Sequence, residues 1–193
     1  MLIVQYIAID LFILFLMRLS NRFLVVAAVL VVISLGASAQ THDYRGKGYK
    51  GSVSITDQFG VFVGVETSHG YMFDRHNYLG VGAGSFVFPN SSHPTFLNVF
   101  VDYHNFLSNK ASTPILGLKA GGSHSFYNNG NGLTDVKFKN AVVIEPSTGW
   151  SWGLKSGNGL TLGLGAALYI PVGESMTDQK VLPMPKLSFG FEF

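Results

Sequence analysis

The chain has 193 residues, of which 12% are charged and 13% are aromatic, and its formal net charge is +2. A charge this small, without a cluster of Lys and Arg, argues against a protein that binds nucleic acid. The chain contains no cysteine, which excludes disulfides, thiolate metal sites and a lipid-modified N-terminal Cys. Low charge combined with 23 glycines and many aromatic residues is typical of an exported β-protein that faces lipid.

The first 39 residues have the pattern of a secretory signal peptide. Residues 20–22 (Ser-Asn-Arg) give a short basic start, residues 23–35 are almost entirely apolar, and residues 36–39 end in an Ala-x-Ala cleavage site. We therefore expect cleavage after Ala39, which makes 1–39 a signal peptide region and leaves 40–193 as one domain. A second apolar stretch lies upstream, and the basic residues after Met17 indicate that translation starts at Met17.

An uncleaved membrane anchor is the alternative for this N-terminal region. Both apolar stretches fall short of the roughly 18–20 apolar residues with which a helix crosses a bilayer. We therefore favour export with a cleaved signal peptide.

Turn signals recur along the rest of the chain, whereas helical periodicity is nearly absent. Dividing the chain at these turns predicts eight strands. They cover residues 49–56, 61–73, 78–88, 95–107, 114–126, 138–154, 160–171 and 185–193. Bacterial outer-membrane barrels have an even number of strands, and eight is the smallest. The predicted fold is therefore all-β, an eight-stranded antiparallel up-and-down transmembrane β-barrel preceded by a helical signal peptide.

The connections between these strands differ in length on the two sides. The second, fourth and sixth are short, whereas the third, fifth and seventh are longer or richer in Pro, Asn and Gly. This alternation matches short periplasmic turns and longer extracellular loops. With the N-terminus inside, the first strand runs outward and the eighth ends at the periplasm.

Apolar and polar residues alternate within most of the strands, which places them on opposite faces. In strand 160–171, for example, Leu162 and Leu164 alternate with Gly163 and Gly165. The apolar face of a soluble barrel lies inside, whereas that of a transmembrane barrel faces lipid. A soluble periplasmic lipocalin-like barrel is thus the rival fold.

The polar face collects almost every charge that falls within a strand, with equal numbers of acids and bases. An eight-stranded barrel has an interior that side chains just fill, where an unpaired charge is costly, so a balanced set favours the inward orientation. We predict a lumen charge network in which His104 joins these charges. The network comprises Lys50, Glu66, Asp102, His104, Lys119, Lys139, Glu145, Lys186 and Glu192.

Aromatic residues gather at the ends of the strands that run back toward the periplasm. This distribution is typical of an aromatic girdle at a membrane–water interface, although β-propensity alone also enriches aromatics in strands. The predicted interface aromatics are Tyr71, Phe73, Tyr103, Trp150 and Trp152.

At this point the chain resembles the small outer-membrane β-barrel proteins of Gram-negative bacteria, of the OmpA and OmpX type. Residues 49–51, 67–71, 78–82 and 190–193 are most similar to the Bacteroidetes-type barrels. The resemblance covers the whole mature domain. It implies that the last strand is the signal recognised by the outer-membrane assembly machinery, carried by Leu187, Phe189, Phe191 and Phe193. It implies little about function, because the family includes structural barrels, adhesins and a few lipid-modifying enzymes.

His124 is the strongest candidate for chemistry, since it lies between Ser123 and Ser125 with Glu145 on the neighbouring predicted strand. A Ser–His–acid set there would resemble lipid A deacylases. Strand parity, however, sends His124 outward and the other three residues inward, so we do not expect a catalytic triad. His69 and His76 lack the ligand spacing of a metal site. We expect no enzyme activity, no metal and no cofactor.

The sequence thus predicts a porin-like protein of the bacterial outer membrane with a filled lumen and a role in envelope structure or surface contact. The alternatives are a lipid A-modifying outer-membrane enzyme and a narrow gated pore. The expected partners are outer-membrane lipid, lipopolysaccharide and the outer-membrane assembly machinery. We expect a monomer that does not bind nucleic acid.

Overall fold

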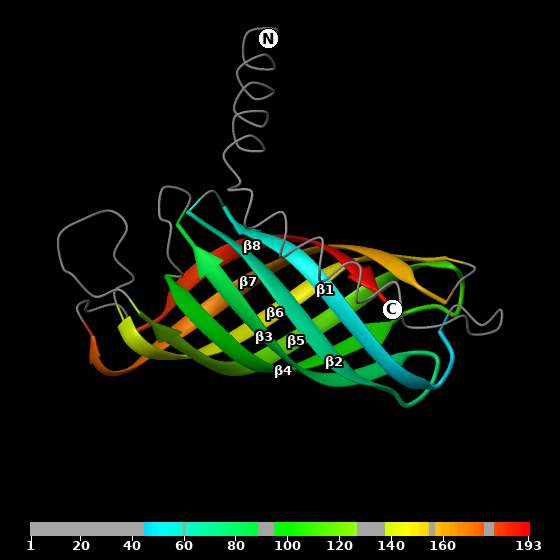
Figure 1. Ribbon diagram of the computed structural model, residues 1–193, viewed down its shortest axis with the longest axis horizontal. Coiled ribbons are helices and arrows are strands. Elements are labelled where there is room, and N and C mark those ends of the chain that lie inside the picture. The colour runs from blue at the N-terminus through cyan, green and yellow to red at the C-terminus, as the bar shows by residue number, and fades with distance from the viewer. Residues whose placement is uncertain (1–44, 60, 89–94, 127–137, 155–156, 176–179) are drawn as a thin grey trace, which may run out of the picture. The chain divides into compact units, whose positions relative to one another are not determined.

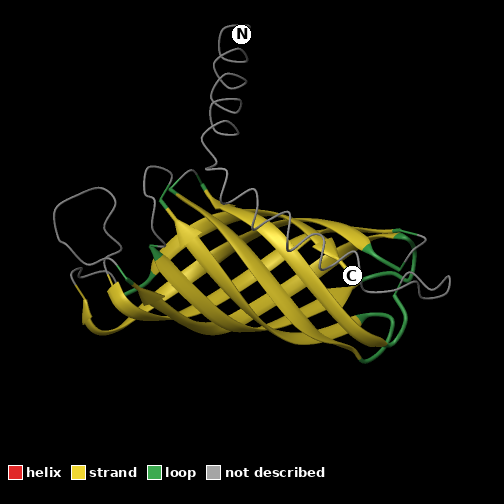
Figure 2. Ribbon diagram, in the orientation of Figure 1, coloured by secondary structure: helices red, strands yellow, loops and turns green. Residues whose placement is uncertain are grey.

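The computed structural model describes residues 45–59, 61–88, 95–126, 138–154, 157–175 and 180–193. The predicted signal peptide and its cleavage site lie outside these residues. The described part contains no helix of the length and apolarity that crossing a membrane requires. It consists instead of eight strands (Figure 1, Figure 2), namely β1 Gly48–Gln58, β2 Phe62–Met72, β3 Asn77–Val87, β4 Phe96–Phe106, β5 Ser112–Ser125, β6 Phe138–Gly153, β7 Gly159–Ser175 and β8 Leu182–Glu192.

The strands form a closed barrel in chain order, in which every strand pairs antiparallel with its neighbours and β8 pairs with β1. Closure gives every strand two hydrogen-bonded neighbours, as a membrane interior requires. The predicted fold of eight antiparallel strands is confirmed. We call the end of the barrel where β1 begins and β8 stops the terminal end, and the opposite end the distal end.

The largest boundary differences fall on β7 and β8. β7 continues to Ser175, past the predicted end at residue 171, and β8 begins at Leu182 although Pro183 and Pro185 follow. Proline lacks the N–H that a strand donates to its neighbour. Pairing of β8 with β1 starts only at Leu187. Phe193 is an even number of residues from both prolines, so its N–H points to the same side as theirs would, and it donates this N–H to β1. The missing N–H groups of the prolines therefore point to the side where β8 has no partner strand.

The wall of the barrel is apolar on its outer surface. Large apolar side chains alternate outward along every strand, and their exposed fractions reach 63% at Val81, 57% at Val99 and 56% at Leu164. A continuous exposed apolar surface of this kind marks contact with a nonpolar medium or partner. Most of the charged side chains within the strands point to the interior.

The interior is filled in layers. At the distal end Phe86 stacks on Phe96 with ring centroids 4.7 Å apart, and Phe62 and Tyr169 pack edge-on against Phe96. Glycines make room for these rings, because a Cβ at Gly64 would lie 2.5 Å from the Phe86 ring. Toward the terminal end a second apolar cluster, formed by Met72, Tyr78, Phe106 and Ile115, lies on the β2–β5 side of the interior. Charged residues fill the interior between the distal aromatic layer and the terminal end.

Candidate functional site

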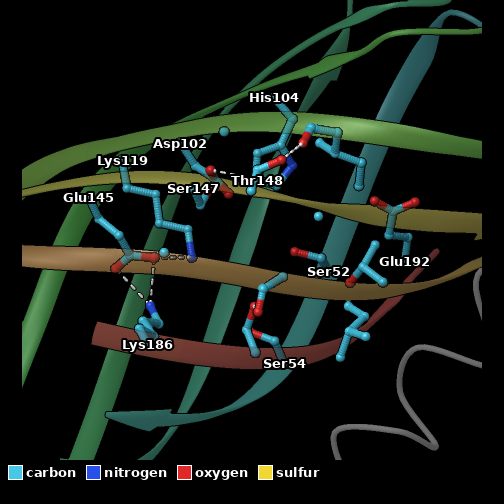
Figure 3. Close-up of a pocket in the computed structure, with 18 residues that line it drawn as sticks. Ser52, Ser54, Asp102, His104, Lys119, Glu145, Ser147, Thr148, Lys186 and Glu192 are labelled. Atoms are coloured by element: carbon cyan, nitrogen blue, oxygen red, sulfur yellow. Dashed lines mark hydrogen bonds and ion pairs between the residues drawn. The ribbon is translucent and has the colours of Figure 1, made fainter. Parts of the chain in front are cut away.

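The centre of the lumen is a four-residue cluster of alternating charge, which we call the central cluster; Figure 3 shows Lys119, Glu145 and Lys186 of it. Nζ of Lys186 lies 2.7 Å from Oε1 of Glu66 and 2.7 Å from Oε2 of Glu145. Nζ of Lys119 lies 2.6 Å from Oε2 of Glu66 and 3.8 Å from Oε1 of Glu145. The four side chains come from β2, β5, β6 and β8, so the cluster ties strands on different sides of the barrel to one another.

Aromatic rings support the two lysines of the central cluster. Nζ of Lys119 lies 4.8 Å from the ring centroid of Phe100, and Nζ of Lys186 lies 5.8 Å from that of Phe86. A cation at this distance from a ring face is attracted by the ring quadrupole. The central cluster is therefore neutralised internally and braced against the distal aromatic layer.

A second network lies toward the terminal end and includes a residue that precedes β1. Nζ of Lys50 is 2.9 Å from Glu192 Oε2, to which the Ser151 hydroxyl also donates at 3.3 Å. Arg45 donates to the same hydroxyl at 3.0 Å, and its guanidinium lies 4.9 Å from the ring centroid of Phe106. Burial lowers the pKa of Arg45 below its ordinary value, and the charge of Glu192 partly opposes this shift.

Arg45 also holds the β4–β5 turn. Its guanidinium donates hydrogen bonds to the backbone oxygen of Lys110 at 2.5 Å and to that of Ala111 at 3.3 Å. The segment before β1 is thus anchored at the terminal end between this turn and the Ser151–Glu192 contact. The planar guanidinium suits this arrangement because it offers several donors in a fixed fork.

Asp102 and His104 form a third group on β4. Nε2 of His104 lies 3.0 Å from Oδ1 of Asp102, and the two residues share the inward face of the strand. The ring of His104 lies 5.6 Å from that of Tyr78, whose hydroxyl is 2.8 Å from the Ser68 hydroxyl. These contacts make a polar strip on the lumen wall beside the second network.

Lys139 does not join the lumen network, contrary to the prediction from strand parity. It is exposed near the distal end of β6, and the structure gives it no ion pair within the described part of the chain. The pairing of β6 with β7 shifts register between Phe138 and Asn140, opposite the strand end where Gly173 has a φ of 87°. Regular alternation of faces therefore does not extend to this end of β6.

Arg45 provides the fourth interior base that was assigned to Lys139. The interior acids in the described residues are Glu66, Asp102, Glu145 and Glu192, and the strongly basic residues are Arg45, Lys50, Lys119 and Lys186. Arg45 lies outside the predicted strands, so alternation along strands gave it no assignment. Only its position in the sequence indicates an interior role, because Arg45 closely precedes the first strand, at the end of the barrel where β1 begins.

A polar cavity of about 70 Å³ lies between the central cluster and the second network (Figure 3). Small residues such as Ser52, Ser54 and Gly165 line it together with Asp102 and Glu192. Its size and polar walls suit a few water molecules rather than an organic ligand. No group of three or more His, Cys, Asp or Glu that suits a metal ion occurs in the residues that the structure describes.

The predicted interface aromatics all lie on the outer surface toward the terminal end. Each is exposed, and two of them hydrogen-bond to polar residues of an adjacent strand end. Tyr103 donates its hydroxyl to Oδ1 of Asn77 at 2.7 Å, and Trp150 donates Nε1–H to the Ser112 hydroxyl at 2.7 Å. The five residues of this belt are Tyr71, Phe73, Tyr103, Trp150 and Trp152.

The four residues of the predicted assembly signal point outward from β8 and the end of the chain. Leu187 and Phe189 are exposed, whereas Phe191 and Phe193 are half-buried against neighbouring side chains. The half-burial of Phe193 follows from its position beside β1, where β8 closes the barrel.

The residues around His124 do not converge into a catalytic arrangement. His124 is exposed on the outer surface, where its Nδ1 lies 2.7 Å from Oδ1 of Asn140. Ser123, Ser125 and Glu145 are buried on the inward face. His69 and His76 also lie apart, since His69 is on the outer surface of β2 and His76 hydrogen-bonds in the β2–β3 turn to the backbone oxygen of Phe106.

No protein-family model matches the chain, and no curated protein matches it. Among solved structures, the chain is similar to the N-terminal β-barrel domain of Pseudomonas aeruginosa OprF, with 10% identity, a TM-score of 0.49, and coverage of 75% of this chain and 96% of that one. Neisserial surface protein A is similar with 14% identity and a TM-score of 0.49, covering 75% of this chain and 92% of that one. The outer membrane enzyme PagL is similar with 13% identity and a TM-score of 0.47, covering 73% of this chain and 97% of that one. At these identities the likeness concerns the fold alone.

Proposed function

We propose that the chain is an integral outer-membrane β-barrel whose plugged lumen makes it a structural or surface-contact protein of the bacterial envelope and not an enzyme. The observation that carries this proposal is the inverted wall. Exposed aliphatic side chains cover the outside, whereas Lys186, Glu66 and Asp102 are almost fully buried inside. In water such a wall would expose its apolar face and bury its charges, whereas in a bilayer both faces have a suitable environment.

The proposed orientation places the terminal end at the periplasm. There the connections are short, at 73–76, 107–111 and 154–158, whereas those at the distal end include 88–95 and 126–137. The aromatic belt lies at the terminal end, where amphipathic rings suit the headgroup region of the inner leaflet. Tyr103 and Trp150 each direct a polar atom to a hydrogen-bond partner there.

A charge introduced on the outer wall tests membrane insertion directly. Val101 is 50% exposed in the middle of β4, and Leu107 is 52% exposed just after this strand. Lys at the bilayer midplane costs about 2–4 kcal/mol and much less near the interface, whereas an exposed substitution on a soluble protein stays within about 0.5 kcal/mol. We expect Val101→Lys to lower the free energy of unfolding in lipid vesicles and Leu107→Lys to change it little. Equal small effects would support the soluble barrel.

Two further measurements address location and closure. We expect carbonate washing to leave the processed chain in the envelope fraction, and we expect the unboiled protein to migrate differently from the boiled protein on SDS gels. Release by carbonate together with unchanged migration would contradict the proposal. Outer-membrane lipid, lipopolysaccharide and the assembly machinery are the proposed partners, with the chain as a monomer, and membership in the Bacteroidetes-type branch stays a prediction from sequence resemblance.

The alternatives fit the geometry less well. A lipid A-modifying enzyme needs His124 beside a serine nucleophile, but the neighbouring serines face the lumen. A gated pore needs a continuous polar path, but an aromatic layer fills the distal end of the lumen. Unchanged lipid A mass spectra after gene deletion and flat current traces in planar bilayers are the results that the proposal expects.

A further inference from the structure

The point where the barrel closes places the last residue of the chain directly beside Gly51 of β1. The N–H of Gly51 donates to the backbone oxygen of Phe193 at 2.8 Å, and the N–H of Phe193 donates to that of Gly51 at 2.9 Å. Residues that are directly opposite in an antiparallel pair present their side chains on the same face. The Phe193 ring therefore extends over Gly51 on the outer, lipid-facing surface (Figure 1 shows the end of β8 beside β1).

On its other side Gly51 pairs with His69 of β2, so three residues lie in a row across β8, β1 and β2. Because Gly51 has no side chain, the rings of His69 and Phe193 meet over it, with centroids 6.0 Å apart and planes inclined by 69°. A Cβ at Gly51 would lie 2.6 Å from the Phe193 ring and 3.2 Å from Nδ1 of His69. The gap at Gly51 is thus filled by the C-terminal ring.

The ring of His69 is held in place by a directed chain of hydrogen bonds. Thr67 Oγ1 donates to the backbone oxygen of Ser52 at 3.1 Å, which uses the only hydrogen of this hydroxyl. Nε2 of His69, 3.0 Å from Thr67 Oγ1, therefore donates to it. Nδ1 then accepts the hydroxyl hydrogen of Tyr49 at 2.6 Å, and the Tyr49 ring stacks on the imidazole. All of these partners lie on β1 and β2, so the hydrogen bonds that hold His69 do not involve β8.

We propose that Gly51 and His69 form a receiving site for the Phe193 side chain, which seats β8 against β1 when the barrel closes. This inference rests on the proposed function. Gly51 leaves the gap into which the ring fits, and His69 forms the wall beside it. The site therefore favours formation of the seam between β1 and β8 in the observed register.

Two lipid-facing strand glycines give a matched test. Gly51→Val pushes the Phe193 ring out of its position, whereas a Cβ at Gly122 of β5 meets no atom within 4 Å, so Gly122→Val is the control. Closure is measured through a disulfide between Thr56→Cys and Ser188→Cys, which are opposite each other across the seam in a chain that has no cysteine. In cells, we expect Gly51→Val to slow formation of this disulfide in newly made chains by about twofold to fivefold, the size of one cross-strand pair, and Gly122→Val to leave it unchanged.

A second pair of variants keeps the test valid if Gly51→Val does not fold. His69→Leu removes the wall of the site without adding bulk over Gly51, and His124→Leu removes an outward histidine of β5 that also has a side-chain partner. Slower closure for His69→Leu alone supports the receiving site, and equal closure rates within both pairs overturn it. If the unsubstituted chain fails to form the seam disulfide in the membrane fraction, the proposed function itself is wrong.

Discussion

Removal of Lys186 tests whether ion pairs hold the lumen together. Its side chain is only 2% exposed, and it bridges Glu66 and Glu145 at 2.7 Å each. In Lys186→Met, Glu66 keeps Lys119 at 2.6 Å, but Glu145 is left with Lys119 at 3.8 Å as its nearest charge partner among the described ion pairs. Removing one partner from a buried pair costs about 3–5 kcal/mol, because the other charge stays buried without compensation. We expect a loss of stability of about this size.

The assay is reversible urea unfolding of the barrel in lipid vesicles, with Lys139→Met as the matched control. Lys139 is exposed, so its substitution should change the free energy of unfolding by no more than about 0.5 kcal/mol. The double variant Lys186→Met with Glu145→Met removes one charge of each sign, leaving Glu66 paired with Lys119. We expect it to be more stable than Lys186→Met alone. If Lys186→Met costs no more than Lys139→Met, the central cluster does not stabilise the barrel.

Three further results are expected from the same geometry. Arg45→Met should destabilise the barrel by about 1–3 kcal/mol and accelerate amide hydrogen exchange in the turn at 107–111, and Arg45→Lys should not restore protection because an ammonium lacks the planar fork. Phe86→Ala should cost about 3–5 kcal/mol in urea unfolding by opening a cavity in the distal aromatic layer. The hydrogen bonds from Asn77 and from the backbone of His76 lower the pKa of Asp74. The stabilisation that these hydrogen bonds give the β2–β3 turn is therefore complete above the ordinary aspartate pKa of about 3.9. It is lost only as pH falls through the lowered pKa of the folded protein. NMR titration of Asp74 checks this, and an unshifted pKa would contradict it.

The barrel and its two faces were predictable because alternation is a local property of the chain. In strand 160–171, Leu162 and Leu164 alternate with Gly163 and Gly165, and this pattern alone determines which side chains share a face. The structure places the leucines outside and the glycines against the cavity. The same rule placed Glu66, Lys119 and the other members of the central cluster on the inward face.

The pairing of the interior charges was not predictable in the same way. Strand parity gave Lys139 an inward position, but the register shift next to it depends on the backbone of β7, where Gly173 has a positive φ. Arg45 carried no pattern because it precedes the first strand, and its contacts come from β4, the β4–β5 turn and β6. Contacts between segments this far apart follow from closure of the barrel, which a pattern within one strand does not contain.

The central cluster also explains how a glycine-rich wall keeps one register. A slip of one residue turns every side chain of a strand to the other face. For β8 such a slip moves Lys186 from its two carboxylates to the outer wall, where Lys near the midplane costs about 2–4 kcal/mol. Glu66 and Glu145 would then remain in the lumen without their shared partner. Since Pro185 and Gly190 weaken the intrinsic strand preference of β8, we infer that the buried charges contribute specificity of pairing in addition to stability.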